Sequence, residues 1–289
     1  MKKIAMVGGD RREAVAAGVL RDHSYFVTAY GLAGEEGTAS ASLESCLNGA
    51  DALILPARGG DENGRVPGIS PLCPVTLTEA ALKALNPSAP VCCGIASKPL
   101  RDTVLRSGHP LLEVLENDAV AVPNAALTAE GALHFVMGRL AETIRGKTVA
   151  VFGFGRVGRA CAELFTAVGC RVSVFCRRER DLIAGRREGF DLRFLGGASV
   201  LLPKTDIVIN TVPAAVVGGE LLRLVPEKSL LIEVASSPGG IDGEEARRLG
   251  LDYVALPGLP GKYAPVSAGE ILGSYYAALF DGGGEEVAR

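Results

Sequence analysis

The chain contains 289 residues, of which 48% are hydrophobic and 22% are charged, and its net charge at pH 7 is −3. This length allows two domains of ordinary size, and the composition is typical of a soluble globular protein. The slightly acidic balance argues against a general nucleic-acid-binding protein. No apolar run approaches the roughly 20 residues of a membrane span. The N-terminal stretch MKKIAMVGGD is too weakly apolar for a signal peptide, so we expect a cytoplasmic protein.

The cysteines and histidines do not indicate a metal site. The cysteines contain no C-x-x-C pair, and they are Cys46, Cys73, Cys92, Cys93, Cys161, Cys170 and Cys176. Buried thiols in a reducing compartment explain them. The histidines lie far apart in the sequence without a cluster of other ligands beside them, and they are His23, His109 and His134.

Short β-rich runs alternate with helical patterns along the first part of the chain, which predicts a parallel sheet covered by helices. The expected strands are Ile4–Val7, Phe26–Tyr30, Ala52–Leu55, Val91–Cys93 and Ala119–Val122. The expected helices lie near residues 11–21, 42–48, 75–85 and 98–107. Gly59–Pro71 is predicted to be a long polar loop, and loops of that length are often functional.

A helix is predicted between the two halves of the chain. Thr128 is its expected N-cap, and Glu130 lies in the predicted first turn, where a negative charge interacts favourably with the helix dipole. An apolar stripe follows at Leu133, Val136, Leu140 and Ile144.

The second half repeats the alternation of strands and helices. Its expected strands are Thr148–Phe152, Arg171–Phe175, Ile207–Asn210, Leu230–Val234 and Tyr253–Leu256. We therefore expect an α/β protein with two Rossmann-like, doubly wound domains, in which parallel sheets are joined by long helices. Residues 1–124 would form an N-terminal α/β domain for substrate and catalysis, and residues 125–267 a Rossmann NAD(P)-binding domain. A C-terminal helix is expected over 268–280. The segment 268–282 could complete the first domain, or the helix could pack on a second copy of the chain.

The segment VFGFGRVG, residues 151–158, places the pattern G-x-G-x-x-G between a predicted strand and a predicted helix. Gly153 permits a tight turn, Gly155 lets a pyrophosphate approach the backbone, and Gly158 lets the helix pack closely on the sheet. The first helical turn, which contains Arg156 and Val157, then presents N–H groups to an anion. The pattern therefore predicts a dinucleotide site.

The end of the second strand of this half indicates which dinucleotide binds. Cys176 stands where an acidic residue would accept hydrogen bonds from the ribose hydroxyls of NAD. Arg177 and Arg178 follow, and arginine matches the geometry of a phosphate group. The pattern favours NADP over NAD. The alternative is a solvated arginine cluster, and the nearby Glu179 and Asp181 weaken the phosphate signal.

Three later loops are expected at the same edge of the sheet, where ligands of such folds bind. They are NTVPA at residues 210–214, EVASSPGGID at 233–242 and LPGLPGKYAP at 256–265. Candidate cofactor contacts in these loops are Thr211, Pro213 and Ala235. The prolines and glycines would hold the backbone close to a nicotinamide ring.

Several segments resemble the family of dipicolinate synthase A subunits. They are MVGGDRR, LTAEGAL, VFGFGRVG, NTVPA, EVASSPGG and PGLPGKYAPVSAGEIL, and they spread over most of the chain. The layout is more distantly similar to that of alanine dehydrogenase and the D-2-hydroxyacid dehydrogenases, which also pair two α/β domains.

The resemblance implies an enzyme that oxidises a dihydrodipicolinate-type intermediate of the lysine pathway to pyridine-2,6-dicarboxylate in a sporulating cell. It also implies a nicotinamide cofactor as hydride acceptor and, as partner in a hetero-oligomer, the flavoprotein-like B subunit of dipicolinate synthase. The chain itself would be a homo-oligomer. A dicarboxylate requires cationic or N–H donors. Arg12 is the first candidate for a substrate contact, and the others are Asp10, Ser236 and Ser237.

The catalytic candidates lie at the expected domain junction, and they are Asn124, Thr128 and Glu130. Glu130 is the candidate general base, although the helix dipole explains its position as well. Asp10 has a second interpretation as the N-cap of the first helix.

Two other functions remain open at the level of the sequence. One is an NADP-dependent amino-acid or hydroxyacid dehydrogenase of similar architecture, which would need a histidine or lysine acid/base that the three histidines are poorly placed to supply. The other is a sensor or scaffold that binds NADP without turnover.

Overall fold

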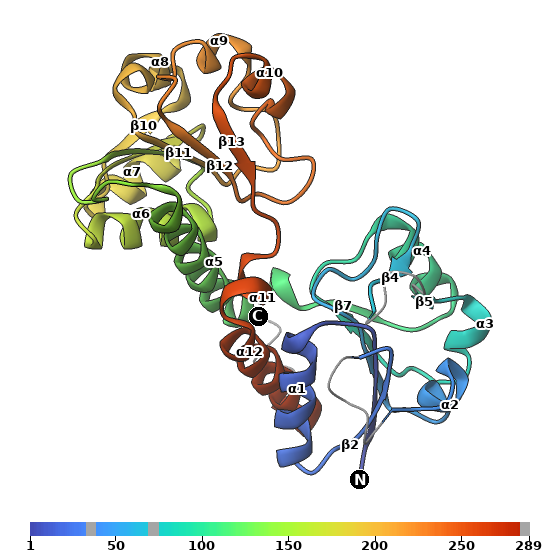
Figure 1. Cartoon of the computed structure of the whole chain (residues 1–289). Coiled ribbons are helices and arrows are strands. Elements are labelled where there is room, and N and C mark those ends of the chain that lie inside the picture. The colour runs from blue at the N-terminus through green and yellow to red at the C-terminus, as the bar shows by residue number, and fades with distance from the viewer. Residues whose placement is uncertain (33–38, 69–74, 284–289) are drawn as a thin grey trace. The chain divides into compact units, whose positions relative to one another are not determined.

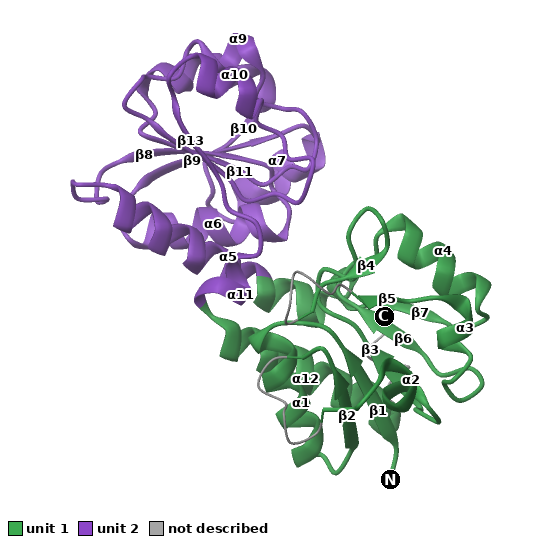
Figure 2. Ribbon diagram, turned by 45° about the vertical axis from the view of Figure 1, so that its right-hand side comes forward, with its two compact units in different colours: residues 1–124, 264–289 green, residues 125–263 purple. Residues whose placement is uncertain are grey.

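The structure is a computed structural model that describes residues 1–32, 39–68 and 75–283 (Figure 1). Cys73 and the last residues of the predicted Gly59–Pro71 loop lie outside this part of the chain. The chain divides into two compact units (Figure 2). One contains residues 1–124 and the C-terminal segment from Ala264, and the other contains Ala125–Tyr263.

The first unit is built on a parallel sheet. Its strands are β1 (Lys3–Val7), β2 (Phe26–Tyr30), β3 (Ala52–Ile54), β6 (Val91–Cys93) and β7 (Leu111–Glu113). They lie in the order β2-β1-β3-β6-β7. A separate antiparallel pair is formed by β4 (Arg65–Val66) and β5 (Val75–Thr76). The helices are α1 (Arg11–Asp22), α2 (Leu43–Leu47), α3 (Glu79–Leu82), α4 (Lys98–Arg106), η1 (Val114–Glu116), α12 (Pro265–Ala278) and η4 (Leu279–Gly283).

Both faces of this sheet are buried, as a parallel sheet requires. Ile4 and Met6 of β1 pack in the cluster that contains the buried residues of α1 and α12, whereas Ala5 and Val7 pack against α2, α3 and α4. The successive side chains of a strand point to opposite faces, so one apolar run serves two cores.

Helix α12 packs directly on α1 through two glycines (Figure 1). A Cβ atom at Gly269 would lie 2.6 Å from the Cβ of Val15, and one at Gly273 would lie 2.7 Å from the Cβ of Val19. The glycines therefore permit a close helix contact that a larger residue would block.

The second unit is also a parallel sheet with helices on both faces. Its strands are β8 (Thr148–Phe152), β9 (Arg171–Cys176), β10 (Leu192–Phe194), β11 (Ile207–Asn210), β12 (Leu230–Glu233) and β13 (Asp252–Ala255). Its helices are α6 (Arg156–Ala167), α7 (Glu179–Arg187), η2 (Leu195–Gly197), α8 (Ala198–Leu201), η3 (Leu202–Lys204), α9 (Gly219–Leu222), α10 (Gly243–Arg248) and α11 (Leu259–Tyr263). The strand order β10-β9-β8-β11-β12-β13 is that of dinucleotide-binding doubly wound folds. The predicted fold class is confirmed.

The prediction was wrong where the chain passes between the two halves. Residues 119–122 were expected to form a strand, but they belong to α5 (Asp118–Arg139). The Asn117 side chain accepts a hydrogen bond of 2.8 Å from the Ala119 N–H, which starts the helix there. Thr128 is therefore not an N-cap and Glu130 is not in a first turn, because both lie well inside α5.

Other differences concern short elements. The fifth strand of the first parallel sheet is β7, and the predicted helix over 75–85 is reduced to α3, with Val75–Thr76 in β5. The third strand of the second unit in chain order, β10, was not predicted. Within the described residues, no helix is long and apolar enough to cross a membrane.

Candidate cofactor site

The glycine turn lies at the carboxyl end of β8, next to the point where the strand order reverses between β8 and β11. This is the place where open α/β sheets bind their ligands. Helix α6 begins there with Gly155 as N-cap, and this cap makes no side-chain hydrogen bond. The turn therefore presents the positive end of a 12-residue helix at the edge of the sheet.

The three glycines of the turn differ in what the fold requires of them. Gly153 has φ of +103°, and a Cβ there would lie 2.4 Å from the Thr211 hydroxyl oxygen. A Cβ at Gly158 would lie 2.2 Å from the Gly153 carbonyl oxygen. Gly155 has φ of −83°, and a Cβ there would meet no atom within 4 Å. The fold therefore requires the first and third glycines, whereas the second leaves an open cradle above the helix terminus that suits a pyrophosphate.

A hollow of about 300 Å³ opens over this turn. Six of the predicted cofactor residues line it together, and they are Gly153, Gly155, Arg177, Arg178, Thr211 and Pro213. The other four do not line it. Arg156, Val157 and Gly158 lie in the first turn of α6, and Ala235 follows β12.

The residues after β9 give the hollow a mixed charge. Arg177 and Arg178 are exposed, and Asp181 lines the same hollow in the first turn of α7. Cys176 is buried, and burial raises the pKa of its thiol, so it contributes no charge. Two guanidinium groups therefore accompany one carboxylate at the end of the second strand.

Thr211 connects the next loop to the glycine turn. Its hydroxyl donates a hydrogen bond of 2.8 Å to the Phe152 carbonyl, and its N–H donates to the same oxygen at 2.9 Å. Ser236 and Ser237 are exposed in the loop after β12, and the Ser236 carbonyl accepts a hydrogen bond from the Gly239 N–H.

The predicted substrate contacts of the first unit form a local network. Asp10 is the N-cap of α1, where it accepts from the Arg12 N–H and pairs with the Arg12 guanidinium at 2.8 Å. Burial acts to raise the pKa of Asp10, but the hydrogen bonds and charge of Arg12 bring it below the ordinary value. The capping interpretation of Asp10 is thus realised, and its carboxylate already has a cationic partner.

Glu13 is a buried group that the sequence reasoning missed. Only 2% of its surface is exposed, and its carboxylate accepts hydrogen bonds from the N–H groups of Asp10 and Ala57. It links the start of α1 to the loop after β3, and burial raises its pKa. The signal was present in the sequence, because D-x-x-E before an apolar run predicts a capping box.

The three catalytic candidates all lie on α5, but they do not share one face. Thr128 is buried and Glu130, two positions later, is exposed. Two positions correspond to about 200° of rotation around a helix. Asn124 lies one turn before Thr128 on the same helix. His134 is exposed and packs against the ring of Tyr263, with 4.7 Å between the ring centroids.

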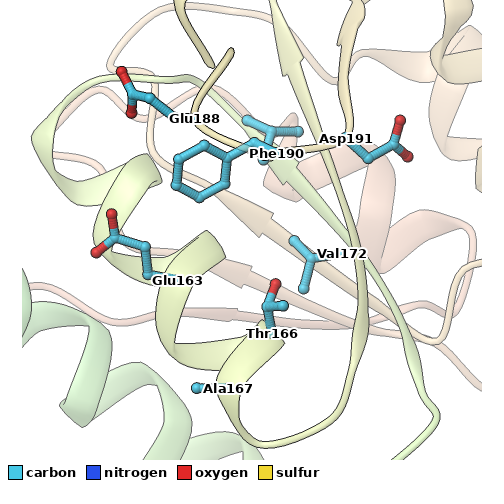
Figure 3. Close-up of a pocket in the computed structure, with 9 residues that line it drawn as sticks. Glu163, Thr166, Ala167, Val172, Glu188, Phe190 and Asp191 are labelled. Carbon is cyan, nitrogen blue, oxygen red and sulfur yellow. The ribbon is translucent and has the colours of Figure 1, made fainter. Parts of the chain in front are cut away.

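A larger hollow of about 550 Å³ lies elsewhere in the second unit, beside the amino end of β10 (Figure 3). Glu163, Glu188 and Asp191 surround it with Phe190 and Val172. Two of these carboxylates are paired with arginines, Glu188 with Arg159 and Asp191 with Arg193, so the hollow offers few free cationic groups to the phosphates of a dinucleotide. It also contains none of the predicted site residues, so the smaller hollow at the glycine turn is the better cofactor site.

The described residues contain no group of three or more His, Cys, Asp or Glu side chains that could hold a metal ion. The hollow at the carboxyl edge of the second sheet offers arginine side chains, the Thr211 hydroxyl and the glycine turn to a ligand.

Comparison with known proteins places each half of the chain. Residues 3–115 match the model of the N-terminal domain of the dipicolinate synthase A subunit. Residues 127–239 match the NAD-binding domain of the D-isomer specific 2-hydroxyacid dehydrogenases. These matches support a nicotinamide-binding, dehydrogenase-like second unit.

Relatives match over nearly the whole length. The dipicolinate synthase A subunit of Bacillus subtilis (strain 168) is 28% identical over 282 residues, which cover 96% of this chain and 95% of the relative. The crystal structure of the Bacillus halodurans A subunit has a TM-score of 0.88 and 31% identity, with 96% of this chain and 97% of that chain covered. The Bacillus subtilis A chain gives a TM-score of 0.88 at 27% identity, with 99% and 97% covered. This chain belongs to the family of dipicolinate synthase A subunits.

Proposed function

We propose that the protein oxidises a dihydrodipicolinate-type intermediate to pyridine-2,6-dicarboxylate, with NADP or NAD bound at the glycine turn. The observation that carries the cofactor role is the open cradle at Gly155, since neither the backbone angles nor the packing of the protein requires glycine there. Membership of the family of dipicolinate synthase A subunits supports the choice of substrate.

The cofactor would be held by three groups of residues. The pyrophosphate would lie over Gly155 at the start of α6, and Thr211 and Pro213 would line its path. Arg177 and Arg178 would receive a 2′-phosphate, which favours NADP. Asp181 opposes this preference, because it places a negative charge on the same hollow. When bound, the cofactor supplies the hydride acceptor.

The substrate loses one hydride and one proton as its ring becomes aromatic. Its two carboxylates would be bound by Arg12, Ser236 and Ser237, with Asp10 orienting Arg12. Arg12 keeps donors for this role, because Asp10 engages only its Nε and one Nη atom and a guanidinium has five N–H groups. Glu130 would accept the proton, and Asn124 and Thr128 would position the ring.

The protein would act with a flavoprotein-like B subunit in the cytoplasm of a sporulating cell, and would itself be a homo-oligomer. The names of the relatives support a second component, since they are called the A subunit or the A chain of dipicolinate synthase.

The test mixes the protein, with and without the B subunit, with the lysine-pathway intermediate and either NADP+ or NAD+. We expect dipicolinate and reduced cofactor to appear together, and both to form more slowly with the variant Gly155→Asp when the cofactor concentration is near the Kd of the unmodified protein. If no combination yields dipicolinate, the proposal is wrong. If the protein binds the dinucleotide but turns over a hydroxyacid or no substrate, the dehydrogenase or the sensor alternative holds instead.

A further inference from the structure

Glu233 ends strand β12 as a buried carboxylate at the edge of the sheet where the cofactor site lies. Only 5% of its surface is exposed, and its neighbour across the sheet, Asn210 at the end of β11, is completely buried. The Asn210 amide nitrogen donates to both carboxylate oxygens, at 2.8 and 2.9 Å. Buried polar side chains such as these two are expected to have hydrogen-bond partners, and each supplies partners to the other.

Three backbone groups also donate to this carboxylate. The N–H of Ala235 lies 3.0 Å from Oε1, and those of Gly240 and Ile241 lie 2.7 and 3.0 Å from Oε2. Each of these partners is an N–H donor, so both oxygens of Glu233 act as hydrogen-bond acceptors. Glu233 therefore binds both ends of the loop 235–241 by hydrogen bonds.

The same network fixes the loop after β11. Asn210 donates to the Val212 carbonyl at 2.9 Å, and its own amide oxygen accepts from the Val212 N–H. The Gly240 carbonyl accepts from the N–H groups of Val216 and Val217, both at 2.9 Å. A Cβ at Gly240 would lie 2.5 Å from the Ala214 carbonyl oxygen, so the two loops are in close backbone contact.

The loop from Val212 to Val216 is part of the wall of the hollow over the glycine turn. In a doubly wound fold the first three strands serve the adenosine half of a dinucleotide, and the last three serve the other half. The loops after β11 and β12 therefore lie on the side of the nicotinamide nucleotide. The hydrogen bonds that arrange them converge on a single buried side chain, Glu233.

We propose that Glu233 is the positioning residue for the nicotinamide half of the cofactor, with Asn210 as its helper. The inference rests on the proposed cofactor role of this site. Replacing the carboxylate by an amide turns one acceptor into a donor that faces N–H groups, and leaves buried donors unsatisfied. The two loops would then separate, whereas the glycine turn and the Arg177–Arg178 region would keep their geometry.

The experiment compares two ligands by calorimetry on the full chain. One is the complete dinucleotide, NADP+ or NAD+, and the other is the matching ADP-ribose fragment, with or without the 2′-phosphate, which lacks the nicotinamide ring. For Glu233→Gln we expect affinity for the dinucleotide to fall about tenfold or more, because several buried hydrogen bonds are disturbed, and affinity for the fragment to change less than about twofold. Thermal unfolding confirms that the variant is folded.

Two further variants complete the test. Asn210→Ala keeps all three backbone donors of Glu233, and it should show a weaker but equally selective loss of affinity for the dinucleotide. It therefore replaces Glu233→Gln in the test if that variant does not fold. Glu245→Gln is the matched control, since Glu245 lies on α10 in the same unit and pairs with Arg223 and Arg248. It should change neither affinity.

The outcomes separate the inference from the proposed function. Equal losses for dinucleotide and fragment, or no loss for either, overturn the role of Glu233 alone. If the unmodified protein binds neither NADP+ nor NAD+, the proposed cofactor role fails, and the role of Glu233 fails with it.

Discussion

The substitution Gly155→Asp should separate the stability of the fold from the binding of the cofactor. Gly155 is the N-cap of α6, it has φ of −83°, and a Cβ there meets no atom within 4 Å. Aspartate is a favourable N-cap residue, and its charge interacts well with the helix dipole. We therefore expect the free energy of unfolding to change by no more than about 0.5 kcal/mol, and toward greater stability.

The same side chain should interfere with a dinucleotide. Two like charges about 4 Å apart repel by about 1 kcal/mol in water and about 4 kcal/mol at the effective dielectric of a protein surface. Since 1.4 kcal/mol corresponds to a factor of ten in affinity, the loss should lie between roughly fivefold and a thousandfold, before the volume of the side chain adds to it.

Gly158→Ala provides the opposite case. Its Cβ would lie 2.2 Å from the Gly153 carbonyl oxygen, so the turn and the helix must move apart. We expect this change to lower the free energy of unfolding by about 1–3 kcal/mol.

Urea unfolding of each free protein and calorimetric titration with NADP+ and NAD+ measure the two effects. Undiminished affinity of Gly155→Asp for both cofactors would show that no pyrophosphate lies over the turn. A stability loss beyond about 2 kcal/mol in that variant would refute the open cradle, because such losses require a clash or an unsatisfied group.

Three further predictions concern specificity, packing and thiol reactivity. Replacing Arg177 and Arg178 together by Ala should raise the Kd for NADP+ far more than that for NAD+, and equal effects would exclude a phosphate site there. Gly273→Val should lower the free energy of unfolding in urea by about 2 kcal/mol, because its side chain meets α1, whereas Gly18→Ala, at an open position of α1, should raise it by up to about 1 kcal/mol. Burial raises the pKa of Cys161 to about 12, so almost no thiolate is present at pH 8. Iodoacetamide should therefore label this residue only in denaturant, and rapid labelling of the native protein, measured by mass spectrometry, would contradict the burial.

Much of the fold could be predicted because many of its strands are continuous apolar runs. Val91–Cys93, Thr148–Phe152 and Ile207–Asn210 have the predicted bounds, since a strand buried on both faces has a clear composition. Phe26–Tyr30, at the edge of the first sheet, also has the predicted bounds. The elements that were missed or misread are short or ambiguous. β7 and β10 have three residues each, as β6 does, but β6 is completely buried whereas β7 and β10 are only partly buried.

The segment Ala119–Val122 shows why local composition fails. Alternating alanine and valine suits a strand, but Asn117 caps a helix there, and Val120 is buried as part of that helix. A single side-chain hydrogen bond and the packing of the helix outweigh a β propensity that spans only about 1 kcal/mol.

The cofactor side of the site could be predicted further than the substrate side. A glycine pattern with a fixed position after a strand implies its own geometry, and six residues drawn from it and from the two neighbouring loops line one hollow. The capping role of Glu13 had a local signal, but its bond to Ala57 and the contacts of Glu233 could not be predicted, because those partners are distant or lie in irregular loops. Glu13 binds Ala57, 44 residues away, and Glu233 binds Asn210, 23 residues away.

The most direct test counts products in one reaction under argon. The protein, with the B subunit, would receive the dihydrodipicolinate-type intermediate and the cofactor that binds more tightly, and dipicolinate and reduced cofactor would be quantified at successive times. We expect one molecule of reduced cofactor for each molecule of dipicolinate at every time point, and less of both with Gly155→Asp at a cofactor concentration near the Kd of the unmodified protein. Formation of dipicolinate without reduced cofactor would contradict hydride transfer at the glycine turn.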